Sequence, residues 1–237
     1  MKDSAQLDNI KILAFDVFGT VVDWHGSILT EVKQLQLDID ANAFTLAWRA
    51  GYAPAMQRVM SGELGWTRID DLHRMILDDL LEQFSITSLS EDQKYELNRI
   101  WHRLDPWPDS VSGLTKLKSK YTICTLSNGN MGLLADMAKK AGLPWDCILS
   151  AELFRKYKPD PATYLGVAEV FDVRPEQVML VAAHQSDLEA ARRCGLATAY
   201  IERAFEFGKN QIKDVSPSSD NSLHAKDLVE LASILNI

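Results

Sequence analysis

The sequence predicts an α/β fold: a doubly wound, Rossmann-like parallel-sheet core with an inserted helical cap subdomain. Short apolar runs bounded by turn residues alternate with helix-length segments in the second half of the chain, a pattern typical of parallel strands joined by helices. Between the first apolar run and the second lie roughly a hundred residues with helical rather than strand periodicity. The first observation predicts the sheet, and the second predicts the insertion.

The strands of the core are expected where the apolar runs are short and end in turn residues. The runs are KILAF at 11–15, YTICTL at 121–126, CIL at 147–149, VMLVA at 178–182 and TAYI at 198–201. Helices are expected around 131–141, 161–171 and 187–194. Ligands of such a sheet bind just past the carboxyl ends of its strands.

The cap is expected over residues 23–105, with 1–22 and 106–237 forming the core. Apolar side chains inside the insertion repeat at helical spacing, at Phe44, Trp48, Gly51, Tyr52, Ala55 and Val59. Similar patterns run through 66–84 and 91–103, and Asp-Pro-Trp-Pro at 105–108 marks the return to the core.

The polar segment KDVSPSSDNS at 213–222 has the turn-rich composition of a loop. It is expected to be a connector that leads into the last helix.

Composition and charge exclude several classes of protein. The 237 residues carry a formal charge of −8, which argues against nucleic acid or an anionic membrane as partner, because both need a basic surface. Three widely spaced cysteines indicate a reducing compartment and predict neither a disulfide framework nor a zinc site. The polar start, MKDSAQLDN, lacks the apolar core of a signal peptide, so a cytoplasmic protein is expected.

The first strand ends at a carboxylate, Asp16, which is followed by Phe18, Gly19 and Thr20. At such a position backbone N–H groups are free to hold an anion. An Asp that merely caps the next turn is the structural alternative, and this stretch alone does not decide between the two.

Further motifs follow in order along the chain. After DVFGT at 16–20 and the helical insertion come LSNG at 126–129, YKPD at 157–160 and VAAHQSD at 181–187. Together they resemble the four ordered motifs of the haloacid dehalogenase superfamily over nearly the whole chain. WRAGY at 48–52 and the opening DVFGTVVDW are most similar to its L-2-haloacid dehalogenase (type II) branch.

Two departures separate this chain from the phosphatases of that superfamily, which resemble DxDGT at the first motif and GDxxxD at the fourth. Phe18 stands where the phosphatases have a general acid, and a halide, unlike an alkoxide, leaves without a proton. Ala183 stands at one of the carboxylate positions that hold Mg²⁺, and only Asp187 remains. We therefore expect a site without a metal and an enzyme without a cofactor.

The resemblance implies how substrate is bound. It places Arg49 and Asn128 at the departing halide, and Ser127 at the substrate carboxylate together with the backbone N–H groups of Val17 and Phe18. Each residue also has an ordinary interpretation: an isolated Arg is usually solvated, and Ser127 and Asn128 fit a strand end with a helix cap.

The remaining residues are implied to serve the nucleophile. Thr20 would orient Asp16 or close the turn, and Lys158 would keep Asp16 ionised. Asp187 would hold the hydrolytic water, and Tyr164 is a supporting residue. His184 stands where related sequences have Asn, and it is either a partner of that water, a base near neutral pH or a structural residue. In the cap, Trp24 and Met60 are candidates for excluding water from the pocket.

The expected reaction is hydrolytic dehalogenation of short (S)-2-haloalkanoic acids to (R)-2-hydroxy acids through an ester on Asp16. The partner is then a small anionic haloacid, and the resemblance suggests a homodimer. Two alternatives stay open at this point: a Mg²⁺-dependent phosphatase of small metabolites, and a catalytically silent binding protein with the same fold.

Overall fold

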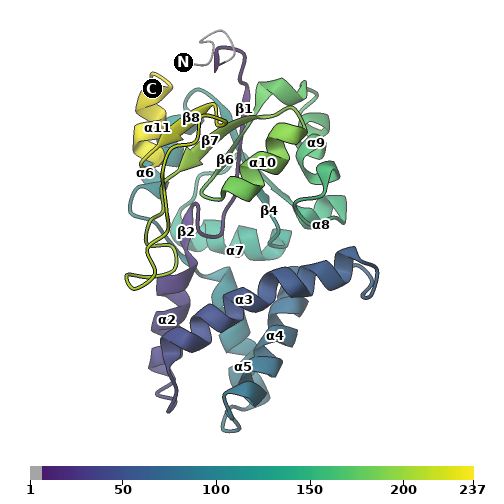
Figure 1. Ribbon diagram of the computed structural model, residues 1–237, viewed down its shortest axis with the longest axis vertical. Helices are drawn as coiled ribbons and strands as arrows, with labels where there is room; N and C mark the ends of the chain where they lie inside the picture. The colour runs from purple at the N-terminus through teal and green to yellow at the C-terminus, as the bar shows by residue number, and fades with distance from the viewer. Residues whose placement is uncertain (1–6) are drawn as a thin grey trace.

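A computed structural model describes residues 7–237 (Figure 1). The first six residues of the expected core, and most of the polar start, lie outside the described residues. A six-stranded sheet forms the upper part of the molecule in the view of Figure 1, and a group of helices lies below it. Among the described residues, no helix is both long and apolar enough to cross a membrane.

The sheet is parallel throughout, with the strand order β5-β4-β1-β6-β7-β8. Leu13 of β1 pairs with Ile123 of β4 on one side and with Met179 of β6 on the other. The strands are β1 (Ile12–Phe15), β4 (Thr122–Ser127), β5 (Cys147–Ser150), β6 (Val178–Ala182), β7 (Ala197–Ile201) and β8 (Leu223–Ala225). The chain runs outward from β1 through β4 to β5 and then returns to β6, so the order reverses between β1 and β6, where ligands of doubly wound sheets bind.

Helices cover both faces of the sheet and bury alternate residues of each strand. Leu13 and Phe15 belong to the core cluster beneath one set of helices, whereas Ile12 and Ala14 belong to the cluster beneath the other. The first set is α6 (Ser110–Lys118), α7 (Met131–Ala141) and α11 (Leu228–Ile234), and the second set is α9 (Pro161–Val170) and α10 (Gln185–Arg193). The short helix α8 (Ala151–Phe154) follows β5, and a 3₁₀ turn, Pro175–Gln177, precedes β6.

The inserted segment is helical. It contains α2 (Trp24–Gln34), α3 (Ala41–Met60), α4 (Ile69–Gln83), α5 (Glu91–Asn98) and a 3₁₀ turn, Arg99–His102. The chain enters and leaves this segment through a two-stranded antiparallel ribbon of β2 (Val22–Asp23) and β3 (Asp105–Pro106). The ribbon lies where the sequence predicts the cap to begin and end, and the treatment of 23–105 as a separate subdomain stays a prediction.

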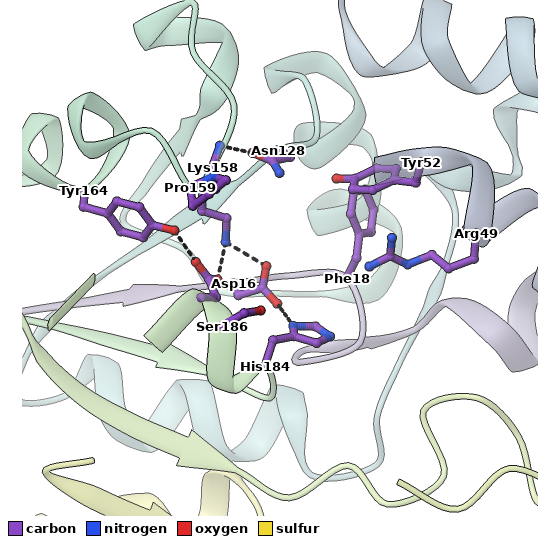
Figure 2. A pocket seen from close by; sticks show the side chains of 11 residues that line it. Asp16, Phe18, Arg49, Tyr52, Asn128, Lys158, Pro159, Tyr164, His184 and Ser186 are labelled. Carbon is purple, nitrogen blue, oxygen red and sulfur yellow. Dashed lines mark hydrogen bonds and ion pairs between the residues drawn. The ribbon is translucent and has the colours of Figure 1, made fainter. Parts of the chain in front are cut away.

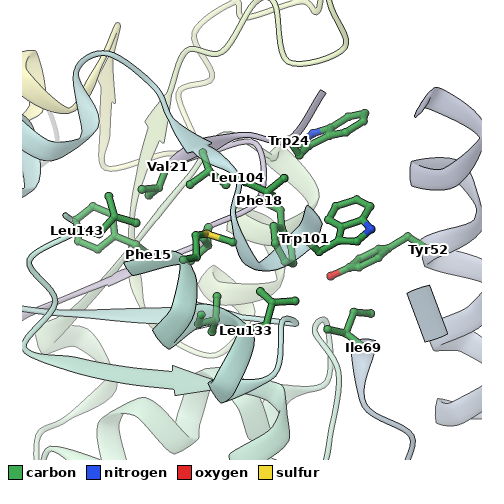
Figure 3. Close-up of a cluster of buried hydrophobic side chains, with 14 of the residues drawn as sticks. Phe15, Phe18, Val21, Trp24, Tyr52, Ile69, Trp101, Leu104, Leu133 and Leu143 are labelled. Atoms are coloured by element: carbon green, nitrogen blue, oxygen red, sulfur yellow. The ribbon is translucent and has the colours of Figure 1, made fainter. Parts of the chain in front are cut away.

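The helical segment shares its apolar core with one face of the sheet. In Figure 3, Phe15 of β1 and Leu133 of α7 lie in one cluster with Phe18, Trp101 and Tyr52. Trp24, Trp48 and Trp101 are fully buried. Burial of a large aromatic side chain is worth roughly 1.5–3 kcal/mol or more, so this continuous packing holds the helices over the end of the sheet.

Among the elements that the sequence analysis does not predict, three were missed for clear physical reasons. Strand β8 is only Leu-His-Ala, too short for a pattern, and it follows the polar stretch expected to lead directly to the last helix. Helix α2 contains Gly26 and has β-branched residues, which weaken the helical signal, although Asp23 caps its start by accepting from the N–H of Gly26 at 2.8 Å. Helix α6 is also not evident from periodicity, because Gly113 interrupts it where it packs tightly on Leu228.

Candidate active site

A cavity of about 250 Å³ lies between helix α3 and the carboxyl ends of β1 and β6; Figure 2 shows the side chains that line it. It lies where the strand order reverses, as expected for this architecture. Its lining comes from strand ends, from the loop before α9 and from helices α3, α9 and α10: Asp16, Phe18, Arg49, Tyr52, Asn128, Lys158, Pro159, Tyr164, His184, Ser186 and Asp187. We call Asp16, Lys158, Tyr164, His184 and Asp187 the floor of this pocket, and Arg49 with Tyr52 its roof.

Asp16 is the centre of the floor and is 7 % exposed. Its Oδ1 accepts from Lys158 Nζ at 3.0 Å, and its Oδ2 accepts from Thr20 Oγ1 at 2.7 Å and lies 3.0 Å from His184 Nδ1. Burial alone would raise the pKa of Asp16, but Lys158 and the hydrogen bonds from His184 and Thr20 outweigh it and hold the pKa well below its usual range. The side chain is therefore an ionised carboxylate with a cation at each oxygen.

Lys158 joins the two carboxylates of the floor. Its ammonium donates to Asp16 and, at 2.5 Å, to Asp187 Oδ2. The other oxygen of Asp187 accepts from the hydroxyl of Tyr164 at 2.7 Å. Burial would lower the pKa of Lys158, but both carboxylates raise it above its usual value, so the lysine stays charged.

His184 bridges Asp16 to a carboxylate outside the cavity. It occupies the N-cap of α10 without a capping hydrogen bond, and its ring instead places Nδ1 at Asp16 and Nε2 at 2.8 Å from Glu206 Oε1. Glu206 is fully buried, and its Oε2 accepts from Lys213 Nζ at 2.6 Å. Burial would lower the pKa of His184, but Asp16 and Glu206 raise it to about 9. The imidazole is protonated near neutral pH.

The turn after β1 shapes the anion site. Gly19 has φ +82°, in the left-handed region, and a Cβ there would lie 2.3 Å from Glu206 Oε1, so both the backbone and the close carboxylate require glycine. Thr20 Oγ1 also accepts from the N–H of Ala183 at 2.9 Å, which ties this turn to the end of β6. Within residues 7–237, the N–H groups of Val17 and Phe18 have no hydrogen-bond acceptor. These two donors are free for a ligand.

The roof places a cation over the pocket. The Arg49 guanidinium carbon lies 4.5 Å from the ring centroid of Tyr52 and 5.7 Å from that of Trp24, both within cation–π range. Its Nε is buried and has no hydrogen-bond partner among the described residues. An unsatisfied donor of this kind costs about 1–3 kcal/mol, which favours an anion or water at this position.

Asn128 connects Lys158 of the floor to helix α3. Its Oδ1 accepts from the backbone N–H of Lys158 at 2.8 Å, and its Nδ2 lies 3.3 Å from Met56 Sδ of α3. Thioether sulfur is a weak acceptor, so the amide keeps donor capacity for a ligand in the cavity.

The position of a second acid is filled by an aromatic ring. Phe18 packs edge-on against Tyr52 at 6.3 Å and Trp101 at 5.6 Å, and it carries no proton to donate. In residues 7–237, no group of three His, Cys, Asp or Glu side chains is arranged to hold a metal ion. The two carboxylates of the floor contact Lys158 instead.

Several expected residues lie behind the pocket. Ser127 is fully buried, and its Oγ accepts from the N–H of Gly129 at 3.1 Å. Trp24 and Met60, the candidates for excluding water, do not line the cavity: Trp24 donates to Glu206 Oε1 at 3.3 Å, and Met60 Sδ faces the N–H of Tyr157. The aromatic lining is Phe18, Tyr52 and Tyr164, and the exclusion of water by Trp24 and Met60 stays a prediction.

Two residues next to the floor were missed by sequence reasoning. Glu206 lies in the loop after β7, and Lys213 lies in the stretch that was expected to be only a connector. Lys213 also donates to the carbonyl of Ala183 at 2.5 Å. The sequence signal for Glu206 and Lys213 is weak: an acidic and a basic residue on a loop near a strand end. Exposed loops commonly carry both, so this signal does not distinguish a functional pair.

Known proteins resemble this chain over most of its length. The family model described as haloacid dehalogenase-like hydrolase matches residues 10–195. (S)-2-haloacid dehalogenase 4A of Burkholderia cepacia is 30% identical over 89% of this chain and 94% of its own length. The crystal structure of the L-2-haloacid dehalogenase PA0810 has a TM-score of 0.91 and 44% identity, covering 95% of this chain and 99% of its own. That of the defluorinating L-2-haloacid dehalogenase Rha0230 has a TM-score of 0.92 and 46% identity, covering 96% of both chains.

Proposed function

This chain belongs to the haloacid dehalogenase-like hydrolases, and from that premise we propose that it hydrolyses the carbon–halogen bond of short (S)-2-haloalkanoic acids through an ester on Asp16. One observation carries the proposal. A buried, ionised carboxylate faces a buried arginine donor across a small cavity, and a phenylalanine occupies the position of a general acid. That combination suits a leaving group that departs as an anion and needs no proton.

In the first step Asp16 attacks the carbon that bears the halogen from the side opposite the leaving group. The carbon–oxygen bond forms as the carbon–halogen bond breaks, and the configuration inverts from (S) to (R). Arg49 and Asn128 receive the halide, and Arg49 supplies a donor that has no other partner among the described residues. The substrate carboxylate binds at the free N–H groups of Val17 and Phe18. Ser127, behind the cavity, holds the loop after β4 by accepting from the N–H of Gly129.

In the second step water attacks Cγ of Asp16 in the ester. The water is held near Asp187, His184 and Lys158, which surround the carboxyl group. The bond from Cγ to the substrate oxygen breaks, the (R)-2-hydroxy acid leaves, and Asp16 is restored with one oxygen from water. Tyr164 and Thr20 hold Asp187 and Asp16 in place.

The reaction as proposed needs no metal ion. The donor set supports this: the fourth motif contributes Ala183 at a position where a carboxylate would bind Mg²⁺. Lys158 Nζ lies between the remaining carboxylates, 3.0 Å from Asp16 and 2.5 Å from Asp187. A divalent cation there would have to displace or repel the ammonium. A phosphatase would also need a proton donor for its alkoxide leaving group, and Phe18 provides none.

The volume of the cavity limits the substrate. About 250 Å³ is below the roughly 300–1,000 Å³ of pockets that hold drug-sized ligands, and it accommodates a short acid with its halogen. One of the similar structures is named a defluorinating enzyme, so we include fluoroacetate among the substrates to be tested. The homodimer and the cytoplasmic location expected from the sequence stay predictions.

The test is an assay of halide release. Purified protein is incubated with (S)-2-chloropropionate and with fluoroacetate in the presence of excess chelator, beside a phosphate ester with added Mg²⁺. We expect chloride release that the chelator does not change, (R)-lactate as product and no phosphate release. Phosphate release with Mg²⁺ and no halide from any haloacid would establish the phosphatase instead, and binding without turnover would establish the silent binding protein.

A further inference from the structure

Glu206 is a buried carboxylate that the proposed reaction does not use. Glu206 is not among the described residues that line the cavity, but it contacts His184, which is. A chain of polar contacts therefore runs from Asp16 through His184 to Glu206 and ends at Lys213. Buried ionised groups are expensive unless paired, so a fully enclosed glutamate beside the nucleophile calls for an explanation.

The surroundings hold the Glu206 carboxylate in one place. Its Oε1 accepts from Trp24 Nε1 at 3.3 Å and lies against Gly19, where any side chain would collide with it. Its Oε2 is bound by Lys213, whose ammonium also contacts the carbonyl of Ala183 beside His184. Burial would raise the pKa of Glu206, but His184 and Lys213 lower it to about 2, so it is an anion at every pH of interest.

A carboxylate at Nε2 decides which nitrogen of His184 carries the permanent proton. Because an ionised carboxylate only accepts hydrogen bonds, Nε2 must keep its hydrogen, and Nδ1 becomes the nitrogen that gains or loses a proton. Nδ1 is the nitrogen that faces the carboxyl group of Asp16, at 3.0 Å. The arrangement matches the general pattern of a base oriented by an acid on its far side.

We propose that Glu206 is the positioning residue of a Glu206–His184 pair, through which Nδ1 of His184 serves as general base for hydrolysis of the Asp16 ester. The inference rests on the proposed function and assigns to this pair the proton transfer in its second step. Asp187 and Lys158 then orient the water and the ester without taking the proton.

The change of charge on Asp16 determines when His184 can act as a base. In the resting enzyme Nδ1–H donates to the Asp16 carboxylate, so His184 is protonated and cannot act as a base. Ester formation removes that negative charge, which lowers the pKa of His184, and Nδ1 releases its proton to solvent through the open pocket. The charged groups around the ring are then Glu206, Lys213, Lys158 and Asp187.

The proton balance of the second step closes. Nδ1 takes a proton from the attacking water and returns it to the substrate oxygen as the bond from Cγ to that oxygen breaks. Asp16 is released as a carboxylic acid and passes its proton to Nδ1, which restores the resting pair. The net reaction consumes haloacid and water and yields hydroxy acid, halide and the one proton released from His184.

The test separates the two chemical steps by rapid quench with enzyme in excess over (S)-2-chloropropionate. Chloride reports ester formation, and intact-protein mass reports its decay. In Glu206→Gln we expect chloride release within about threefold of the unchanged enzyme and ester decay slowed roughly tenfold or more, inside the usual range of general-base catalysis. Glu206→Asp, which keeps the charge, should restore part of the decay rate.

A matched control lies in the same region of the chain. Glu202 accepts from His224 at 2.7 Å, a second Glu–His pair away from the cavity, so Glu202→Gln should leave both steps unchanged. The decay of the ester should accelerate as His184 loses its proton with rising pH, and in Glu206→Gln this rise should move to lower pH. First-order decay does not depend on the folded fraction, so partial unfolding cannot imitate the result.

Two outcomes would overturn the proposed role of Glu206, and a third would refute the proposed dehalogenase function. Equal slowing of both steps in Glu206→Gln means a structural role, and unchanged ester decay means that another group takes the proton. Absence of chloride and of any ester in the unchanged enzyme would instead refute the proposed function, and this proposal with it. Should Glu206→Gln fail to fold, the same comparison is made with Glu206→Asp, for which unchanged decay contradicts the role.

Discussion

The floor and the roof of the pocket differ in how completely their polar groups are paired. On the floor, each side chain forms a hydrogen bond or ion pair with another floor residue: Asp16, Lys158, Tyr164, His184 and Asp187. His184 also contacts Glu206. On the roof, Arg49 stacks on Tyr52 and leaves its buried Nε unpartnered among the described residues. The floor is therefore preorganised before substrate binds, whereas the roof has an unpaired donor, Nε of Arg49, that a ligand can use.

That difference assigns the two regions to different steps. A preorganised floor keeps the nucleophile ionised and oriented without rearrangement during the reaction. The unpaired donor of Arg49 binds the leaving atom more strongly as negative charge develops on it, so it stabilises the transition state more than the bound substrate. The account therefore expects roof variants to affect halide departure and floor variants to affect the nucleophile and the ester.

The largest effect is expected on the roof. Arg49→Ala should slow ester formation by about 10²–10³-fold, equivalent to about 2.7–4 kcal/mol, because the departing halide loses its charged donor. Decay of an ester once formed should change little. Rapid-quench measurement of chloride and of ester mass separates the two. Arg58→Ala, on the same helix but in an exposed pair with Glu63, is the control. Equal slowing of both steps would remove the distinction between roof and floor.

The next largest effect is expected on the stability of the protein when the charge of Glu206, next to the floor, is removed. Glu206→Gln should lower the free energy of unfolding by about 3 kcal/mol, because it leaves two partly buried cations without the buried anion that pairs with them. The pKa of His184 is raised to about 9, so its contribution is complete below about pH 6.5 and lost as the pH rises through 9. The pKa of Glu206 is lowered to about 2, so its contribution is complete above about pH 4.5 and lost as the pH falls through 2.

Denaturant unfolding across pH checks this linkage. The difference between the unchanged protein and Glu206→Gln should be greatest between about pH 4.5 and 6.5, and it should shrink on both sides. A difference that does not vary with pH would mean that packing rather than charge pairing accounts for the loss.

A third effect tests the cation on the floor. Lys158→Met should move the acid limb of the rate of ester formation upward by about 1–3 pH units, because a cation beside Asp16 holds its pKa down. The sign follows from the carboxylate: with a higher pKa it becomes protonated, and non-nucleophilic, at a less acid pH. Lys156→Met, two residues away and half exposed, should leave the limb in place. An unmoved limb in Lys158→Met would show that His184 alone keeps Asp16 ionised.

The smallest effect is expected from Tyr164→Phe. It removes a hydrogen bond to the ionised Asp187, worth about 1.5 kcal/mol, so turnover should fall roughly tenfold and the binding of substrate should hardly change. Steady-state kinetics, with Tyr95→Phe at the exposed surface as control, measures it. A rise in KM without a fall in kcat would place Tyr164 in substrate binding rather than in support of Asp187.

The sequence predicts the fold and most of the floor because both depend on local patterns. Apolar runs mark β1 and β6, and the acid and the histidine that follow them must meet at one edge of a parallel sheet. Lys158 and Asp187 follow from motif order in the same way. Their roles come from a resemblance, and contact alone does not establish them.

The parts that escaped prediction depend on tertiary packing. Glu206 lies 22 residues beyond His184, on a loop whose path is set by contacts with Gly19 and Trp24 rather than by its own composition. Likewise, the aromatic residues that face the cavity cannot be separated from those behind it, because α3 buries Trp48 and presents Tyr52 through its rotation over the sheet end. Periodicity finds a buried face and does not say what lies against it.

The central claim is that Asp16 becomes covalently attached to the substrate, and a single turnover in water enriched in oxygen-18 tests it most directly. With enzyme in excess over (S)-2-chloropropionate, the account predicts one labelled oxygen in the peptide that carries Asp16 and an unlabelled hydroxyl in the lactate. Label in the lactate hydroxyl with Asp16 unlabelled would mean that water attacks the substrate directly, and it would contradict the account.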